Sequence, residues 1–411
     1  MDQLLFKRVF LPFLVLAFVI SCQQQSVNGP SKNAEQTQDS DIVENTISKA
    51  QAVAVAESFA NDYNFQKENL LAGEPAKRKG RPKTVNNVLA VSNEDDQKSI
   101  YLINYNDGGF AVVPADQRLS PIQAYSSENS MPVTTNDTIP GGLAIWLQQR
   151  MNTVDQYRKA KQKVSVGSEI LWARLLNVKG KRRLPPDDGG CEEWSNKVNP
   201  LISTTWGQAN GYNNSAPHMG CDYPSNGRAY SGCVATAMAQ IINYHEHASG
   251  YNYNWSAMPN SYGSDEVSLL MRDIGDEVNM DYGCDASGAD DDDMAPGLRH
   301  FGYSSATQVG YEGTTNRYDV MNDLDDGDPV LFNGYEKDSW LGIFPTNGNG
   351  HAWVGDGYLQ SKLCPTGNVY LNFHMNWGWN GSYDGWYAFN NFDPADSKYN
   401  RNSEVVINIH P

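Results

Sequence analysis

Apolar positions after residue 41 change from helical to strand-like spacing. Residues 46–63 predict an amphipathic helix whose apolar face holds Ile47, Ala50, Val53, Ala54 and Phe59. Strand-like runs follow at residues 84–91, 99–105 and 109–113. The Asn-Asp-Gly-Gly sequence at 106–109 predicts a hairpin turn between the last two strands. Helical spacing returns at residues 143–163 and 170–176, so this part of the chain is expected to form one α+β unit.

The second half of the chain shows helices first and strands afterwards. A helix is predicted from Cys233, with an apolar face of Val234, Ala237, Met238, Ile241 and Ile242. A second helix is predicted over residues 265–278. Short apolar runs separated by glycine then occupy residues 329–332, 352–354, 369–373, 386–389 and 404–409. This order predicts a helical part followed by an antiparallel β part.

A linker rich in helix-breaking residues separates the two halves. The basic cluster at 179–183 is followed by Leu-Pro-Pro-Asp-Asp-Gly-Gly at 184–190. An exposed linker of this kind is a preferred site of proteolysis. Taken alone, it is equally compatible with a removable prosegment and with an ordinary interdomain connection. The predicted units are therefore residues 42–185 and 186–411.

The N-terminus is typical of an exported protein. Lys7 and Arg8 precede an apolar stretch at 9–20, which is too short to span a membrane and indicates a signal peptide. The stretch ends in Val-Ile-Ser-Cys, which resembles a bacterial lipobox with Val in place of Leu, so Cys22 is expected to be lipidated. Ordinary secretion with cleavage nearby is the alternative. Residues 1–22 are the predicted leader, and the polar residues 23–41 are a predicted disordered tether.

Charge and cysteine content exclude some classes of partner and binding site. The net charge of -17 argues against a nucleic-acid partner, because phosphate binding needs clustered Lys and Arg. With Cys22 assigned to lipid and Cys233 to chemistry, four of the six cysteines remain: Cys191, Cys221, Cys284 and Cys364. In an oxidising compartment these can form two disulfides in three pairings. Their spacing matches no zinc pattern, so neither a metal nor a cofactor is expected.

Cys233 is the candidate nucleophile. It follows Gly232 and opens the predicted helix, where unpaired backbone N–H groups and the helix dipole favour the thiolate. Cys221 is a rival in principle, but it lies in a turn-rich segment with no helix start.

Among the seven histidines, His351 is the candidate base. His245 and His247 lie at the far end of the Cys233 helix, on the order of 18 Å away. His374 lies in a strand-like run and is expected to be packed. His351 instead follows a glycine-rich loop and opens a short strand, and Asn376 with Trp377 comes later in the chain. The order Cys, His, Asn, and spacings close to roughly 130–150 residues, are typical of papain-like proteases.

Several segments resemble the streptopain family of papain-like bacterial cysteine peptidases. The matching segments are GCVATAMAQ at 232–240, GHAWVGDG at 350–357, NWGW at 376–379, DG at 384–385, DYG at 281–283, SGA at 287–289, FGY at 301–303, and WGQ at 206–208. The resemblance implies a papain-like α+β fold. GFAVV at 109–113 resembles, more weakly, the family's inhibitory prosegment, which would precede that fold as an α+β prodomain.

The resemblance also implies roles for individual residues. Cys233 would attack the scissile carbonyl, His351 would activate it and protonate the leaving amine, and Asn376 would orient His351. Trp377 would shield that hydrogen bond, and Gln208 would complete the oxyanion hole. Ser287 and Gly350 would border the substrate cleft. The acidic residues 290–293 are expected to cap a helix, with a Ca²⁺ site as the alternative.

The implied protein is an exported cysteine endopeptidase made as a zymogen and anchored in the membrane only through lipid. Its partners would be polypeptide substrates and its own prosegment, cut near residues 181–186. Two alternatives remain: a catalytically idle surface lipoprotein acting as a binding module, and acyl transfer by the same triad. The presence of Gln208, Cys233, His351 and Asn376 together favours an active enzyme.

Overall fold

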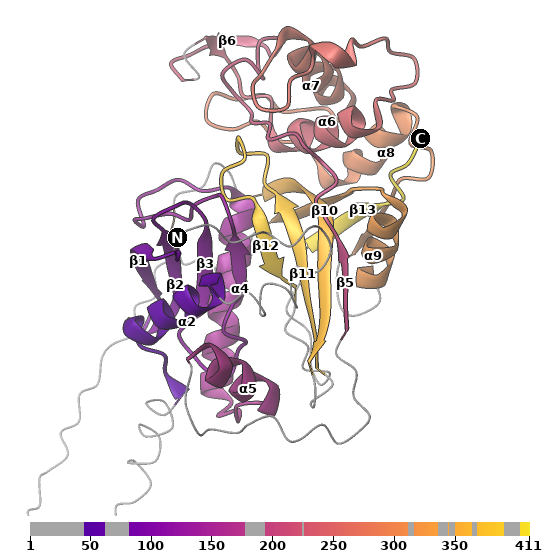
Figure 1. The fold of residues 1–411 in the computed structure, drawn as a ribbon. Coiled ribbons are helices and arrows are strands. Elements are labelled where there is room, and N and C mark those ends of the chain that lie inside the picture. Colours follow the sequence, from indigo (N-terminus) through magenta and orange to yellow (C-terminus); the bar gives the residue numbers. More distant parts are fainter. Residues whose placement is uncertain are drawn as a thin grey trace, which may run out of the picture.

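One large antiparallel sheet connects the N-terminal strands of the molecule to its C-terminal strands (Figure 1). The computed structural model describes residues 45–61, 82–176, 194–223, 226–310, 316–335, 344, 350–363, 368–389 and 403–411. Eleven strands form the sheet in the order β1-β2-β3-β4-β12-β11-β10-β9-β13-β8, with β5 paired to β10. We refer to residues 45–176 as the N-terminal unit and to the described residues from 194 onward as the C-terminal unit.

The N-terminal unit is the predicted α+β unit. Its elements are α2 (Lys49–Asn61), β1 (Val85–Ser92), β2 (Lys98–Tyr105), β3 (Phe110–Pro114), β4 (Ala124–Ser126), α4 (Gly141–Lys159) and α5 (Val166–Leu175). Strand β2 is buried on both faces: Tyr101 and Ile103 pack with α2 and α5, and Ile100 and Leu102 pack with α4. The predicted helices and strands are confirmed, but the three-residue strand β4 was too short to be detected from sequence.

The C-terminal unit has its helices before most of its strands, as predicted. The helices are α6 (Cys233–His245), α7 (Asp265–Glu277), α8 (Met294–His300) and α9 (Asn316–Asp326). The strands are β5 (Trp194–Val198), β6 (His218–Cys221), β7 (Gly227–Arg228), β8 (Thr307–Gly310), β9 (Val330–Tyr335), β10 (Gly350–Leu363), β11 (Asn368–Asn376), β12 (Gly385–Ala388) and β13 (Ser403–Ile407). Helix α9 was missed because its sequence is mostly polar.

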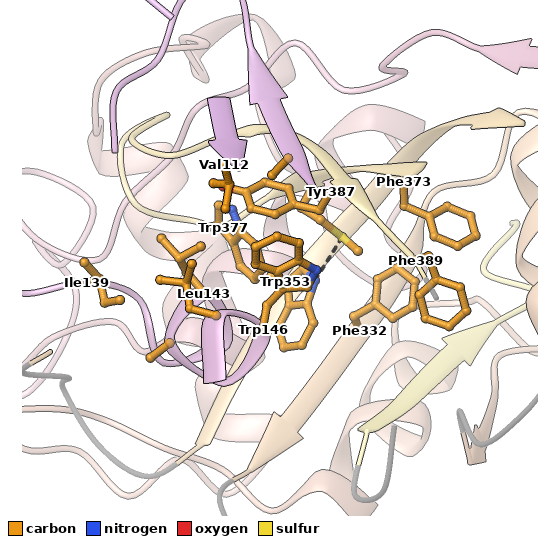
Figure 2. Packing of buried hydrophobic residues seen from close by; sticks show 14 of the residues in the cluster. Val112, Ile139, Leu143, Trp146, Phe332, Trp353, Phe373, Trp377, Tyr387 and Phe389 are labelled. Atoms are coloured by element: carbon orange, nitrogen blue, oxygen red, sulfur yellow. Dashed lines mark hydrogen bonds between the residues drawn. The ribbon is translucent and has the colours of Figure 1, made fainter. Parts of the chain in front are cut away.

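Strands β4 and β12 join the two units into one sheet. Tyr125 pairs with Trp386, and Ala124 pairs with Tyr387. A shared apolar core lies beneath this junction (Figure 2), where Trp146 of α4 packs edge-on against Tyr387 at 5.0 Å between ring centroids. The Trp146 indole N–H also donates to the carbonyl of Ala388 at 3.2 Å. The N-terminal unit is therefore built into the C-terminal unit through backbone pairing and through burial.

The disulfide pattern agrees in part with the prediction. Cys221 and Cys284 form a disulfide, which removes Cys221 as a rival nucleophile. Cys22, Cys191 and Cys364 lie outside the described residues, so their predicted lipidation and pairing stay predictions. Within the described ranges Cys233 is the free cysteine. No helix of the described chain combines the length and apolarity needed to cross a membrane.

Candidate active site

Cys233 is the first residue of α6, and Gly232 caps that helix. The φ of Gly232 is +90°, in the left-handed region that favours glycine. A Cβ at this position would lie 2.8 Å from the Met280 sulfur and 3.1 Å from the Ser287 carbonyl oxygen. Glycine is therefore required for the backbone turn and for the close approach of the neighbouring chain, and together these bring the Cys233 thiol to the helix start.

Cys233 and His351 line the same cleft, whose volume is about 560 Å³. Gln208, Ser287 and Gly350 line it as well, so the predicted oxyanion and substrate residues gather at this cleft. The carbonyl of Gln208 accepts hydrogen bonds from the backbone N–H of Ser231 at 3.0 Å and from its hydroxyl at 3.1 Å. These bonds tie the Gln208 segment to the start of α6.

The lining of the cleft is acidic. Asp281, Asp285, Asp290 and Asp291 line it, and the described lining includes neither Lys nor Arg. Asp290 caps a short 3-10 helix by accepting from the backbone N–H of Asp292, which confirms the capping prediction. The described residues contain no group of three or more His, Cys, Asp or Glu suited to a metal ion.

His351 is the second residue of β10 and is only 6% exposed. Its Nε2 lies 2.9 Å from the carbonyl oxygen of Trp377. Because a carbonyl can only accept, Nε2 carries the proton in this arrangement and Nδ1 is the basic nitrogen. Burial lowers the pKa of His351 to about 4, and the bond to Trp377 opposes this shift only in part.

The sulfur of Cys233 lies in an environment with opposing effects. Burial raises the pKa of the Cys233 thiol, while the backbone N–H groups of Ala352, Val234 and Cys233 itself lower it. The carboxylate of Asp291 raises it further. The expected helix-start effect is present, but burial outweighs it. Both shifts act in the same direction, towards the uncharged forms of the thiol and the imidazole.

The N-terminal unit accounts for part of this burial. Helix α4 begins against β10, so a Cβ on Gly141 would lie 3.4 Å from the Cβ of His351. A Cβ on Gly142 would lie 2.7 Å from the Trp353 ring and 2.8 Å from the Trp377 ring. The first turn of α4 thus packs directly against the candidate base and the indoles beside it.

The predicted partner of His351 needs a correction. Asn376 does not provide the acceptor for the ring, because the backbone carbonyl of the next residue, Trp377, takes that place. The side chain of Asn376 bonds instead to Gln240 of α6, to the carbonyl of Thr204 and to the N–H of Gly378. A side chain committed to four other hydrogen bonds is not available to the histidine.

Trp377 is fully buried, as the shielding role requires. Its ring packs 5.2 Å from that of Trp353 and 5.1 Å from that of Tyr387, and the Trp353 ring is stacked on His351 at 6.1 Å. Figure 2 shows the two indoles beside each other within the shared core. Trp377 therefore contributes a backbone acceptor and an apolar wall, of which only the wall was expected.

Hydrogen bonds fix two further residues that the sequence singled out, Ser287 and His374. The Ser287 hydroxyl donates to the Tyr230 carbonyl at 2.8 Å and accepts from the Gly283 N–H at 3.1 Å, which fixes this edge of the cleft. His374 is packed, as expected, with its Nδ1 2.6 Å from Asp356. Gln240 and Asp384 lie in the segments that resemble the streptopain family, but no role was predicted for either. The only signal for Gln240 was that it is one of two polar residues, with Thr236, among the buried positions of α6.

Two family descriptions match this chain. The Peptidase C10 family matches residues 206–250 and 247–387, and the Spi protease inhibitor family matches residues 44–154. Streptopain of Streptococcus pyogenes serotype M1 is 24% identical over 436 residues, which is 93% of this chain and 92% of streptopain. The thiol protease/hemagglutinin PrtT of Porphyromonas gingivalis is 26% identical over 362 residues, or 77% of this chain, and the chain spans 38% of that protein.

A solved structure has the same fold. A mutant fragment of prointerpain A from Prevotella intermedia superposes with a TM-score of 0.54 at 24% identity, covering 79% of this chain and 99% of the fragment. The α+β, papain-like class is confirmed. The two matched families fall on the C-terminal and the N-terminal unit respectively, and the chain is a cysteine-type peptidase of the streptopain (C10) family with an N-terminal prosegment.

Proposed function

We propose that this chain is the zymogen of an exported cysteine endopeptidase that cuts polypeptides through a thiolate at Cys233. The observation that carries the proposal is that Cys233 and His351 line one cleft while α4 of the prosegment packs against the histidine. The chemistry suits a nucleophile activated by a base that lines the same cleft.

The proposed reaction proceeds in two steps. Nδ1 of His351 removes the thiol proton, and Cys233 attacks the scissile carbonyl to give a tetrahedral oxyanion. The Gln208 side chain and the Cys233 backbone N–H stabilise that oxyanion. His351 then protonates the leaving amine. In the second step His351 takes a proton from water, the water attacks the acyl-enzyme, and the Cys233 sulfur is the leaving group. Asn376 acts as a positioning residue that ties the end of β11 to α6, which is the role its hydrogen bonds support.

We further propose the unit boundaries predicted from sequence. The prosegment is residues 42–185 and the peptidase 186–411, with a cut near residues 181–186 that permits release of the prosegment. Export rests on the leader at 1–22, and anchoring rests on Cys22. Ser287 and Gly350 border the bound peptide, which their place in the cleft lining supports.

Expression of residues 23–411, wild type beside Cys233→Ala, tests the proposal. Intact mass should reveal processing of the wild type only, and a casein digest should give hydrolysis products only with the wild type. Full activity in Cys233→Ala would overturn it. An inert wild type would favour the idle binding module, and products joined to amines in place of water would favour acyl transfer.

A further inference from the structure

We propose that Asp384 is a positioning residue for the active-site histidine, acting through the backbone of Trp377. The inference rests on the proposed roles of Cys233 and His351. It adds an acidic residue to a site in which the sequence pattern suggested an amide as the orienting group.

Two hydrogen bonds of equal length connect the three residues. The Nε2–H of His351 donates to the Trp377 carbonyl at 2.9 Å, and the Trp377 N–H donates to Oδ1 of Asp384 at 2.9 Å. Both polar backbone groups of Trp377 are thus occupied. Asp384 thus anchors the peptide group that precedes Trp377. The Gly378 N–H, which lies in the same peptide group as the Trp377 carbonyl, donates to Oδ1 of Asn376 at 3.1 Å. Together the two bonds restrict where the histidine finds its acceptor.

The regular strand pairing does not hold Trp377 in place. The strand ladder between β11 and β12 ends at the pair Met375 and Gly385, so Trp377 lies beyond it. Between Trp377 and Asp384 the chain has positive φ at Gly378, Asn380, Gly381 and Tyr383. A loop with this many left-handed residues has few regular backbone bonds, and the Asp384 side chain closes it.

The surroundings of Asp384 make a carboxylate costly there. The residue is 6% exposed, and burial raises its pKa to about 7, with the Trp377 N–H and His374 opposing the shift. Asp356 is the second acidic group facing it, and Lys197 is near His374. A buried carboxyl group with a strongly shifted pKa, linked to a catalytic residue through one intervening residue, is typical of a functional site. Protonated or not, the carboxyl keeps an oxygen that can accept from Trp377.

The prosegment contacts the same residue from the other side. The Asn129 side-chain amide donates to the backbone carbonyl of Asp384 at 2.8 Å. In the zymogen Asp384 is therefore held by its backbone to the prosegment and by its side chain to Trp377. After release of the prosegment, the side-chain bond remains as the link to the histidine.

Three substitutions separate hydrogen bonding from charge. Asp384→Ala removes the acceptor. Asp384→Asn keeps an acceptor oxygen and removes the charge, and Asp384→Glu keeps the charge but displaces the oxygen by one methylene. Asp323→Asn is the matched control. Asp323 lies on α9, is also buried, and accepts a hydrogen bond from the backbone N–H of Asn408 at 2.6 Å.

The variants are made in residues 23–411 and processed with added wild-type enzyme. Each is assayed for kcat and KM, and for the pH dependence of Cys233 alkylation by iodoacetamide. We expect Asp384→Ala and Asp384→Glu to lower kcat by about tenfold or more with KM within about twofold. Their alkylation profiles should move to higher pH, because a misaligned His351 stabilises the thiolate less. Asp384→Asn should remain within about threefold of wild type, and the control should be unchanged.

A wild-type kcat and alkylation profile in Asp384→Ala would overturn the inference. So would a rise in KM alone, or a loss in Asp384→Asn as large as that in Asp384→Ala. If Asp384→Ala does not fold, the comparison of Asp384→Glu with Asp384→Asn decides between the same outcomes. Failure of the proposed function looks different, because the wild type itself would then be inactive or Cys233→Ala would be active.

Discussion

Gln240 and Asn376 exchange two hydrogen bonds in the interior of the C-terminal unit. The Gln240 amide donates to Oδ1 of Asn376 at 3.1 Å, and the Asn376 amide donates to Oε1 of Gln240 at 3.2 Å. Gln240 lies two turns beyond Cys233 on α6, and Asn376 ends β11 just before Trp377. The pair thus connects the element bearing the nucleophile to the element bearing the acceptor for the base.

Replacing Gln240 by Leu should destabilise the protein and reduce its activity. Asn376 and the backbone N–H of Trp206 would lose buried partners, and each unsatisfied buried group costs about 1–3 kcal/mol. Urea unfolding in the Cys233→Ala background and kcat of the processed enzyme measure the two effects. Gln360→Leu is the control, since Gln360 is also buried but its side-chain amide donates to the sulfur of Met321. Equal losses in both variants would contradict a specific role.

A larger residue at Gly142 should weaken the docking of the prosegment. The Cβ of Gly142→Val would lie within 3 Å of the Trp353 and Trp377 rings, and overpacking of this kind costs about 1–3 kcal/mol. We expect a lower Tm of the Cys233→Ala zymogen and faster cleavage by added wild-type enzyme. Gly310→Val serves as the control, because nothing lies within 4 Å of a Cβ there. Unchanged cleavage of Gly142→Val would count against the contact.

The zymogen should lose stability on acidification through His351. Burial lowers the pKa of this histidine from 6.5 to about 4 in the folded state. Between these values the unfolded chain binds more protons at this residue, so its contribution is complete above about pH 6.5 and is lost as the pH falls towards 4. The full difference is ~3 kcal/mol.

Unfolding free energies of Cys233→Ala measured between these pH values, with and without His351→Gln, isolate this contribution. The doubly substituted protein should show a smaller decrease in stability on acidification. The raised pKa of Asp384 acts in the opposite direction, and it cancels in the comparison because both proteins retain it. Parallel pH profiles for the two proteins would refute the prediction.

Removing the disulfide should affect the cleft edge more than the nucleophile. Cys221–Cys284 joins the β6–β7 hairpin to the segment that carries Ser287, and it closes a sequence separation of 63 residues. The double replacement by Ser should cost about 2–5 kcal/mol of stability and raise KM, while the alkylation rate of Cys233 stays near wild type. A slower alkylation with unchanged KM would indicate that the bridge acts on α6 instead.

Much of the fold was predictable because local patterns were strong. The helix at Cys233 has a continuous apolar face and begins after a glycine that must adopt a positive φ, and His351 lies at the start of a strand as predicted. The acceptor for His351 was not predictable. A backbone carbonyl has no signature in the sequence, and the amide that should have served, Asn376, is engaged by a residue far from it in the chain.

The pairing of the two units into one sheet could not be predicted from the sequence either. Strand β4 has three residues and β12 has four, and neither pattern indicates its partner. The expected helix-start effect on Cys233 was correct in sign but was outweighed by burial, which depends on what packs above the cleft. Tertiary burial of this kind cannot be derived from spacing alone.

The pairing of β4 with β12 implies that cutting the linker is not enough to free the peptidase. A nicked chain keeps its continuous sheet and its common core, so the two fragments stay together as a non-covalent complex. Separation must expose the backbone edge of β12, and such an edge readily accepts a strand again. Recapture then depends on the concentration of the two fragments, so dilution should activate the cleaved enzyme and a high concentration should keep it inhibited.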